Sequence, residues 1–306
     1  MRGLVHFFQS EYELAEPVLV ESIALARELR DLFSVLVGLM FLGLVQGNRG
    51  RISDALATLH EAMKVARRNG DRFFLPRLPN CVGWIYRELQ DFDHSREWDR
   101  QGLEIAREFD VVEAEANSLI SLGSDFANLG EVGKTIPTFR EVEACFPSDP
   151  WNHWRYDLRL QAAESEHWLR LRDLDQAADH ARQLLAAATR HGVSKYIAIA
   201  HKLLAEAAMA RGDLTDAEVN LAAALDQLHR YPAPLVSWKT YVVLGRLRRQ
   251  MGDGESAREA FVQAGAIVGE IAANVRDEGL RATFLNSTAV REVLDGAKAS
   301  SPAAES

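Results

Sequence analysis

The sequence of 306 residues predicts an all-α fold, a right-handed superhelix of about seven helical hairpins with capping helices at the C-terminus. A column of small residues recurs about every forty positions: Gly3, Gly43, Gly83, Gly123, Ser165, Ala205 and Gly245. A second small column follows twelve residues later: Ala15, Ala55, Ser95, Thr135, Ala177, Ala217 and Ala257. One period held over seven units, with a two-residue slip between Thr135 and Ala177, indicates a solenoid.

Small residues at these two positions let two antiparallel helices approach closely where they cross. A third column, four residues after the second, is mostly apolar: Leu19, Leu59, Asp99, Phe139, Ala181, Leu221 and Phe261. Only Asp99 breaks its apolar character strongly. The core of such a chain is a continuous strip between neighbouring repeats, so length extends the core instead of dividing it.

The units FLGLVQGNRGRISDALATLHEA (Phe41–Ala62) and VLGRLRRQMGDGESAREAFVQA (Val243–Ala264) carry this pattern. They resemble the tetratricopeptide repeat (TPR), and the resemblance covers roughly residues 1 to 270. The period is nearer forty than thirty-four residues, and the proline that usually closes the repeat is missing. Long repeats of this kind look like the C-terminal sensor regions of bacterial signalling ATPases, adenylate cyclases and transcription activators, and LRATFLNSTAVREVL (residues 280–294) is similar to the end of such proteins.

Composition limits the classes of function. The chain has 47% hydrophobic and 26% charged residues, within the globular range, and its net charge of -9 argues against general affinity for nucleic acid. The two cysteines, Cys81 and Cys145, do not make a disulfide scaffold and fit a reducing compartment. No apolar run approaches a membrane span, and the N-terminus does not resemble a signal peptide. We therefore expect a cytoplasmic protein without a membrane or nucleic-acid partner.

The first repeat begins inside its first helix, because Gly3 already occupies the first small column. No preceding helix is expected to cover the apolar side chains of Leu4, Val5, Phe7, Phe8 and Leu14. The hypotheses are that the chain is the C-terminal part of a larger protein, or that it self-associates through this uncapped repeat. The alternative is that Met1 is the native start and the first helix frays. The oligomeric state stays open.

The turns between helices carry their own signals. Residues 46–50 and 90–93 predict the turns of the second and third hairpins, and Ser53 and His94–Ser95 are the predicted caps of the helices that follow. Pro76 and Pro79 fall near the start of a helix, where proline is tolerated.

The sharpest irregularity is the segment 147–150, Pro-Ser-Asp-Pro, which accounts for the slip in the period. Three large aromatic residues follow it, Trp151, Trp154 and Tyr156. Such a cluster can anchor a peptide, but packing over the irregular junction is the favoured interpretation.

The domain organisation follows from these columns. We expect a repeat array over residues 1–275, C-terminal capping helices over 276–296 and a disordered tail over 297–306. The tail is predicted from its small, polar composition.

The first helix of each pair is expected to line the concave surface. Positions six and three before the small residue, and one and four after it, share a face at helical periodicity. In the first two repeats this face is apolar, with Leu4, Phe7, Val37, Met40 and Leu44. The other candidate groove residues are Arg77, Asn80, Trp84, Arg87, Asn117, Arg159, Glu166, Lys202, Glu206, Lys239, Arg246 and Arg249.

Seven of these residues are basic and two are acidic, so the groove would carry +5 in a chain of -9. A concave surface of one sign concentrates the opposite charge, which favours an acidic peptide, a carboxylate terminus or an anionic metabolite. The favoured alternative is a solvated face whose charges are balanced by acids elsewhere. Reversing Arg246 and Arg249 to glutamate is expected to weaken binding of an acidic partner. Binding on the convex side also stays open.

Catalytic motifs are missing from the sequence. Residues 128–135 imitate a phosphate loop, but Asn128 stands where glycine is needed and no strand precedes. His60-Glu61 is followed by Lys64 where a zinc-binding helix needs a second histidine. We therefore expect no enzyme, no cofactor and no metal. The predicted function is a protein or peptide interaction scaffold; the alternative is the ligand-sensing arm of a multidomain signalling protein.

Overall fold

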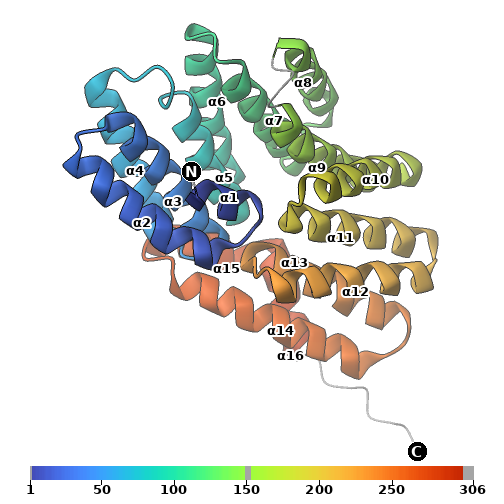
Figure 1. Ribbon diagram of the computed structural model, residues 1–306. Helices are drawn as coiled ribbons and strands as arrows, with labels where there is room; N and C mark the ends of the chain where they lie inside the picture. Colours follow the sequence, from blue (N-terminus) through green and yellow to red (C-terminus); the bar gives the residue numbers. More distant parts are fainter. Residues whose placement is uncertain (1, 149–152, 299–306) are drawn as a thin grey trace, which may run out of the picture.

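The computed structural model describes residues 2–148 and 153–298, and this part of the chain contains helices and no strand (Figure 1). The elements are α1 (Arg2–Phe8), α2 (Tyr12–Glu28), α3 (Leu32–Asn48), α4 (Ile52–Asn69), α5 (Arg77–Glu88), α6 (Phe92–Glu108), α7 (Val112–Asn128), α8 (Val132–Cys145), the 3₁₀ turn η1 (Phe146–Ser148), α9 (His153–Leu171), α10 (Leu174–His191), α11 (Ser194–Arg211), α12 (Leu214–Arg230), α13 (Pro234–Gln250), α14 (Gly254–Ala273), α15 (Glu278–Asn286) and α16 (Thr288–Lys298).

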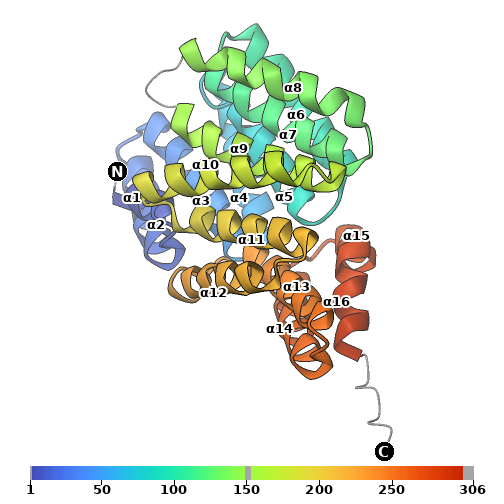
Figure 2. The same ribbon diagram turned by 90° about the vertical axis from the view of Figure 1, so that its right-hand side faces the viewer.

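Helices α1 to α14 form seven successive hairpins that stack into a curved array (Figures 1 and 2). The first small column lies on the odd-numbered helices and the second on the even-numbered ones, and every residue of both columns is buried. The third column covers the first: the side chain of Leu59 lies against Gly43, and that of Phe261 lies against Gly245. The predicted all-α superhelix of about seven hairpins is confirmed.

Gly123 provides a direct test of the close crossing. A Cβ atom at this position would lie 2.3 Å from Cε1 of Phe139, so Gly123→Ala forces the two helices apart. We expect a loss of about 1–3 kcal/mol in the free energy of unfolding, measured with urea. The control is Gly269→Ala in α14, where nothing lies within 4 Å of the new Cβ. Alanine gains up to about 1 kcal/mol in a helix interior, so equal unfolding midpoints for the two variants would contradict this packing.

The array curls until its later repeats touch its earlier ones. After α14, the carbonyl of Asn274 accepts a hydrogen bond from the backbone N–H of Ser53 at 3.1 Å. Arg276 donates its backbone N–H to Ser53 Oγ at 2.8 Å and pairs with Asp54 at 3.0 Å. The superhelix therefore closes on itself, with residues from both ends in one continuous core.

Two predicted helix caps are corrected by the structure. Ser53 does not cap α4, which begins one residue earlier at Ile52; its hydroxyl bonds across the closure instead. At α6 the cap is Asp91, whose carboxylate accepts the N–H of His94. Ser95 is fully buried one turn further on. In each case the helix begins before the serine, because the turn between the two helices ends earlier than the polar residues in the sequence suggest.

The first repeat is covered from the inside of the superhelix. Phe7 contacts the ring of Phe41 with centroids 5.0 Å apart, and Phe8 contacts Trp154 of α9 at 5.9 Å. No helix precedes α1 in the described residues, as expected, but later helices cover both phenylalanines because the array curves back toward them. Val5 and Leu14 do remain exposed.

At the other end, α15 and α16 fold back on the array, and the side chains of Phe284, Val290 and Val293 are fully buried. The last helix continues to Lys298, two residues past the predicted end of the cap. Residues 299–306, which make up the rest of the predicted tail, lie outside the described residues. So does Trp151 of the predicted aromatic cluster. None of the described helices combines the length and apolarity needed to cross a membrane.

Candidate functional site

A cavity of about 580 Å³ lies at the centre of the superhelix. The inner helices α1, α3, α5, α7, α9 and α11 line it, with a contribution from α2. Six repeats therefore share one cavity, which we call the central pocket.

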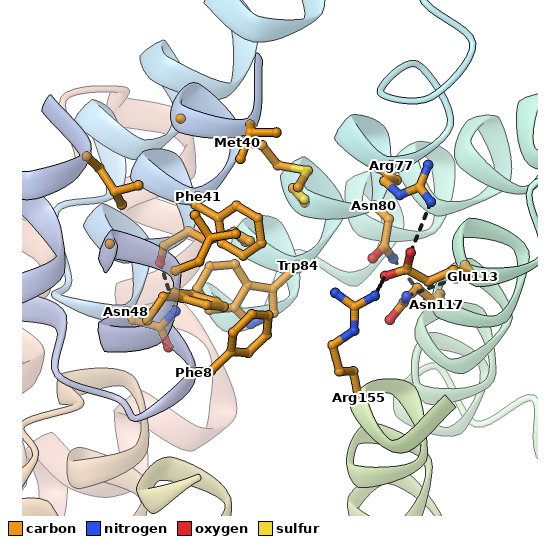
Figure 3. A pocket seen from close by; sticks show the side chains of 18 of the residues that line it. Phe8, Met40, Phe41, Asn48, Arg77, Asn80, Trp84, Glu113, Asn117 and Arg155 are labelled. Atoms are coloured by element: carbon orange, nitrogen blue, oxygen red, sulfur yellow. Dashed lines mark hydrogen bonds and ion pairs between the residues drawn. The ribbon is translucent and has the colours of Figure 1, made fainter. Parts of the chain in front are cut away.

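One wall of the central pocket is apolar and rich in aromatic side chains (Figure 3). Phe8, Met40, Phe41 and Trp84 gather on this side. The Trp84 indole N–H donates to Glu88 at 3.1 Å, which fixes the ring at the wall. This arrangement offers a surface for a large apolar group.

The opposite wall is charged (Figure 3). Glu113 accepts from two guanidinium groups, Arg77 at 3.0 Å and Arg155 at 2.9 Å. One carboxylate is thus shared by two cations. The Nε–H of Arg155 is buried and has no hydrogen-bond partner in the described part of the chain. This wall therefore keeps a net positive charge and an unused donor.

Arg159 lies one turn beyond Arg155 on α9 and donates only to neutral oxygens. Its acceptors are the side chains of Asn117, Asn80 at 3.2 Å and Ser121 at 2.8 Å. No ion pair joins it to a carboxylate among residues 2–148 and 153–298. Burial lowers the pKa of Arg159, since desolvation penalises its charged form. Within these ranges, therefore, Arg159 is a cation without a direct ion-pair partner.

Lys195 is the second such cation. Its Nζ donates to Asn48 Oδ1 at 3.1 Å and lies 5.6 Å from the ring centroid of Trp84 and 5.1 Å from that of Tyr196. Burial lowers the pKa of Lys195 to about 8, although Glu88 partly offsets this effect. Glu88 is paired at 2.7 Å with Lys239 and makes no ion pair with Lys195.

The charged residues that line the central pocket are four basic side chains, Arg77, Arg155, Arg159 and Lys195, and one acidic side chain, Glu113. With every group ionised the lining carries +3. The whole chain carries -9. The positive potential is therefore local to the pocket and opposite in sign to the rest of the molecule.

A buried ionic network lies behind the pocket, and it explains why the third column has a charged residue at Asp99. Arg87 pairs with both Asp99 and Asp125, with 2.8 Å between its Nε and Asp125 Oδ1. Asn80 donates to Asp99 at 2.7 Å, and Ser95 donates to Asp125 at 3.0 Å. Burial raises the pKa of Asp99, opposed by the charge of Arg87 and reinforced by that of Asp125. Asn80 connects this network to the pocket.

The structure divides the predicted groove residues into two groups. Five of them line the central pocket: Arg77, Asn80, Trp84, Asn117 and Arg159. The predicted apolar residues Leu4, Phe7, Val37, Met40 and Leu44 also line it.

The other seven do not line the pocket. Arg87 belongs to the buried network. Lys202 pairs with Glu206 at 2.9 Å and with Glu166 at 3.9 Å. Lys239 pairs with Glu88, Arg246 pairs with Glu292 of α16, and Arg249 lies over the ring of Phe261.

The predicted excess of +5 along the groove is therefore largely compensated. Five of its seven basic residues have a carboxylate partner: Arg77, Arg87, Lys202, Lys239 and Arg246. This is the balance by acids elsewhere that the sequence analysis favoured. Whether any groove residue binds a ligand stays a prediction.

Sequence reasoning missed Glu113, Arg155 and Lys195, although a signal for them exists. Each stands ten residues before the small residue of its repeat, as do Phe33 and Phe73, and all five line the pocket. The position ten residues before the small residue lies one helical turn from the position six residues before it, on the same face of the helix. The pocket lies at the N-terminal halves of α7, α9 and α11, so the lining extends further than the four chosen positions.

Residues 2–148 and 153–298 hold no group of three or more His, Cys, Asp or Glu side chains that could bind a metal. Cys81 lines the pocket, but burial raises the pKa of its thiol to about 12.

No protein-family model matches the sequence, and no curated protein matches it either. Solved structures do match the fold. A Rap protein complexed with competence and sporulation factor is 14% identical, with a TM-score of 0.69 over 90% of this chain and 74% of that one. The Cut9–Hcn1 complex of APC/C matches with a TM-score of 0.62 and 14% identity, over 97% of this chain and 55% of that one. BtubC from P. vanneervenii matches with a TM-score of 0.51 and 18% identity, over 72% of this chain and 91% of that one. Together with the repeat columns and the seven stacked hairpins, this likeness shows that the chain has a tetratricopeptide-like repeat fold.

Proposed function

We propose that the chain is a non-catalytic binding scaffold whose central pocket takes a short peptide. The observation that carries this proposal is the pocket itself, with an aromatic wall facing a wall of amide and basic side chains. A peptide presents the same two chemistries, because its side chains can be apolar while its backbone and termini are polar. Asn80 and Asn117 hold their amide groups at the polar wall.

The size of the pocket supports a small ligand. Its volume of about 580 Å³ lies within the usual range of roughly 300–1,000 Å³ for small-ligand sites. The closure between Ser53 and Asn274 also keeps the concave surface compact. A peptide of a few residues fits these dimensions better than a folded domain does.

The comparison with solved structures supports the same class of function. The Rap protein that shares this fold is complexed with competence and sporulation factor. At 14% identity the likeness concerns the fold, so the ligand of this chain has to be found by experiment.

The test is affinity selection of a random pentapeptide pool on the full chain, followed by calorimetry with the recovered sequences. Phe8→Ala removes part of the aromatic wall, and we expect it to weaken binding by roughly tenfold, since a buried aromatic anchor contributes more than about 1 kcal/mol. Urea unfolding would check that this variant remains folded. Failure to recover any peptide above the level of a resin control would contradict the proposal.

The matched control is Arg246→Glu with Arg249→Glu, the charge reversal that the sequence analysis singled out. Both residues lie outside the central pocket. Unchanged affinity in this double variant, beside the loss in Phe8→Ala, would place binding in the pocket. The reverse result would favour the extended groove.

A sensor function is the second candidate, and the closure favours it. The pocket lining joins repeats one to six, and Lys195 of α11 reaches Asn48 of α3 inside it. A ligand that contacts both helices would change how tightly the superhelix closes. Small-angle scattering with a recovered peptide tests this; an unchanged radius of gyration would leave only the scaffold function.

A further inference from the structure

We propose that the central pocket contains an anion subsite formed by Arg159, Lys195 and Arg155, which binds a carboxylate attached to a large apolar group. This proposal deepens the proposed function, because it specifies the ligand chemistry of the same pocket. The carboxylate can belong to the C-terminus of a short peptide or to a small aryl or alkyl acid.

The first argument is the missing counter-charge. Arg159 and Lys195 both line the pocket, and neither forms an ion pair within the described ranges. Burying an unpaired charge is costly, so a buried cation gains from an anionic ligand. Burial lowers the pKa of Lys195, Glu88 opposes this effect, and the positive charge of Arg159 adds to it, so the two cations lie within electrostatic range of each other.

The second argument is the unused donor on the neighbouring turn. Arg155 and Arg159 are four residues apart on α9, so both side chains extend from one face of the helix. Arg155 uses Nη2 for Glu113 and leaves its buried Nε–H without a partner. Arg155 thus lines the pocket with only part of its donor capacity in use, and guanidinium groups bind carboxylates through parallel N–H donors.

The third argument is the apolar wall opposite. Phe8 lies 5.9 Å from Arg155, measured from its ring centroid to Cζ, and Trp84 lies 5.6 Å from Lys195 Nζ. An apolar group that fills the aromatic wall therefore places its carboxylate beside these cations. A fully hydrated anion such as phosphate cannot use that wall. The structure thus favours an amphiphilic carboxylate over a simple inorganic ion.

Proton uptake gives this subsite a distinctive signature. The pKa of Lys195 is about 8 because the side chain is buried. A bound carboxylate stabilises the charged amine and raises this pKa, so binding near pH 8 takes up a proton and weakens as the pH rises further. The groups that face Lys195 are Tyr196, which follows it in α11, and side chains from four other helices: Asn48 of α3, Trp84 and Glu88 of α5, Arg159 of α9 and Lys239 of α13.

Calorimetry on the full chain tests the proposal with two matched pairs of probes. One pair is 4-phenylbutanoate and its amide; the other is the dipeptide Leu-Phe and its C-terminal amide. We expect each acid to bind roughly tenfold more tightly than its amide, as for a charge-assisted hydrogen bond. The two pairs also separate a peptide carboxylate from a small organic acid. Equal affinity for acid and amide in both pairs would overturn the subsite.

Variants then assign the effect to residues. Arg159→Gln and Lys195→Gln should each lower the affinity for the acids by roughly tenfold, whereas the exposed Arg249→Gln, outside the pocket, should not. Lys195→Arg keeps the charge but does not titrate near pH 8, so it should bind the acids without proton uptake. Proton uptake is measured by repeating the calorimetry in buffers of different ionisation heat.

Asp99 also titrates near this range and interacts with Arg159. Lys195→Arg leaves Asp99 in place, so uptake that persists in this variant would assign the proton to Asp99 and contradict the role of Lys195. If the acids do not bind while pool-derived peptides do, the anion subsite fails and the peptide pocket stands. If neither binds, the proposed function fails as well.

Discussion

Replacing Arg87 by methionine should lower the free energy of unfolding by about 3–5 kcal/mol, because it leaves the buried acidic side chains of Asp99 and Asp125 without the cation that they share. Asp99 and Asp125 are both fully buried and both pair with Arg87. Methionine preserves most of the side-chain volume, so the loss reports on charge more than on packing. Urea unfolding near neutral pH measures the effect.

The control is Arg100→Met on the next helix. Arg100 pairs with Glu97 and Glu104, but all three side chains are at least half exposed. Surface pairs of this kind contribute little, so the unfolding midpoint of Arg100→Met should match that of the parent chain. A similarly small change in Arg87→Met would show that the network does not stabilise the fold.

The second large effect is a fall in stability as the pH rises. Burial raises the pKa of Asp99 from the ordinary 3.8 to about 8. Its folded state therefore holds a proton more tightly than its unfolded state, so stability decreases between about pH 4 and about pH 8. Each unit of pKa difference corresponds to about 1.4 kcal/mol, and the fall across this window should reach a few kcal/mol.

Asp99→Asn isolates this contribution. Asparagine keeps the size of the side chain and has no proton to lose, so the difference in stability between the two chains should grow in favour of the variant as the pH rises. The groups that face Asp99 are Arg87 and Asn80 of α5, Asp125 of α7 and Arg159 of α9, and all are kept. Parallel pH profiles for the two chains would contradict the raised pKa of Asp99.

Lys195 acts with the opposite sign. Its pKa falls from 10.5 to about 8 on folding, so the folded state binds the proton less tightly and stability rises with pH above about 8. This contribution is the same in both chains and cancels in their difference. The comparison of Asp99→Asn with the parent chain therefore reports on Asp99 alone.

The sequence determined the repeat architecture by itself. Each hairpin needs a small residue where its helices cross, as Gly123 and Phe139 illustrate, and this requirement is local and recurs with the period. The same local logic identified the inner helices and, from them, Arg77, Asn80, Trp84, Asn117 and Arg159 as lining residues. Helical periodicity within one repeat is sufficient for this much.

Only the tertiary structure decided which charges remain unpaired and where the pocket lies. Lys195 meets Asn48, and Ser53 meets Asn274, across more than one hundred residues of sequence. The partner of Lys239 likewise comes from the third repeat, and that of Arg246 from the C-terminal helix α16. These contacts depend on the small rotation between neighbouring repeats, summed over the whole array. No single repeat encodes that sum, so the closure and the +3 charge of the pocket emerge only when all seven hairpins are stacked.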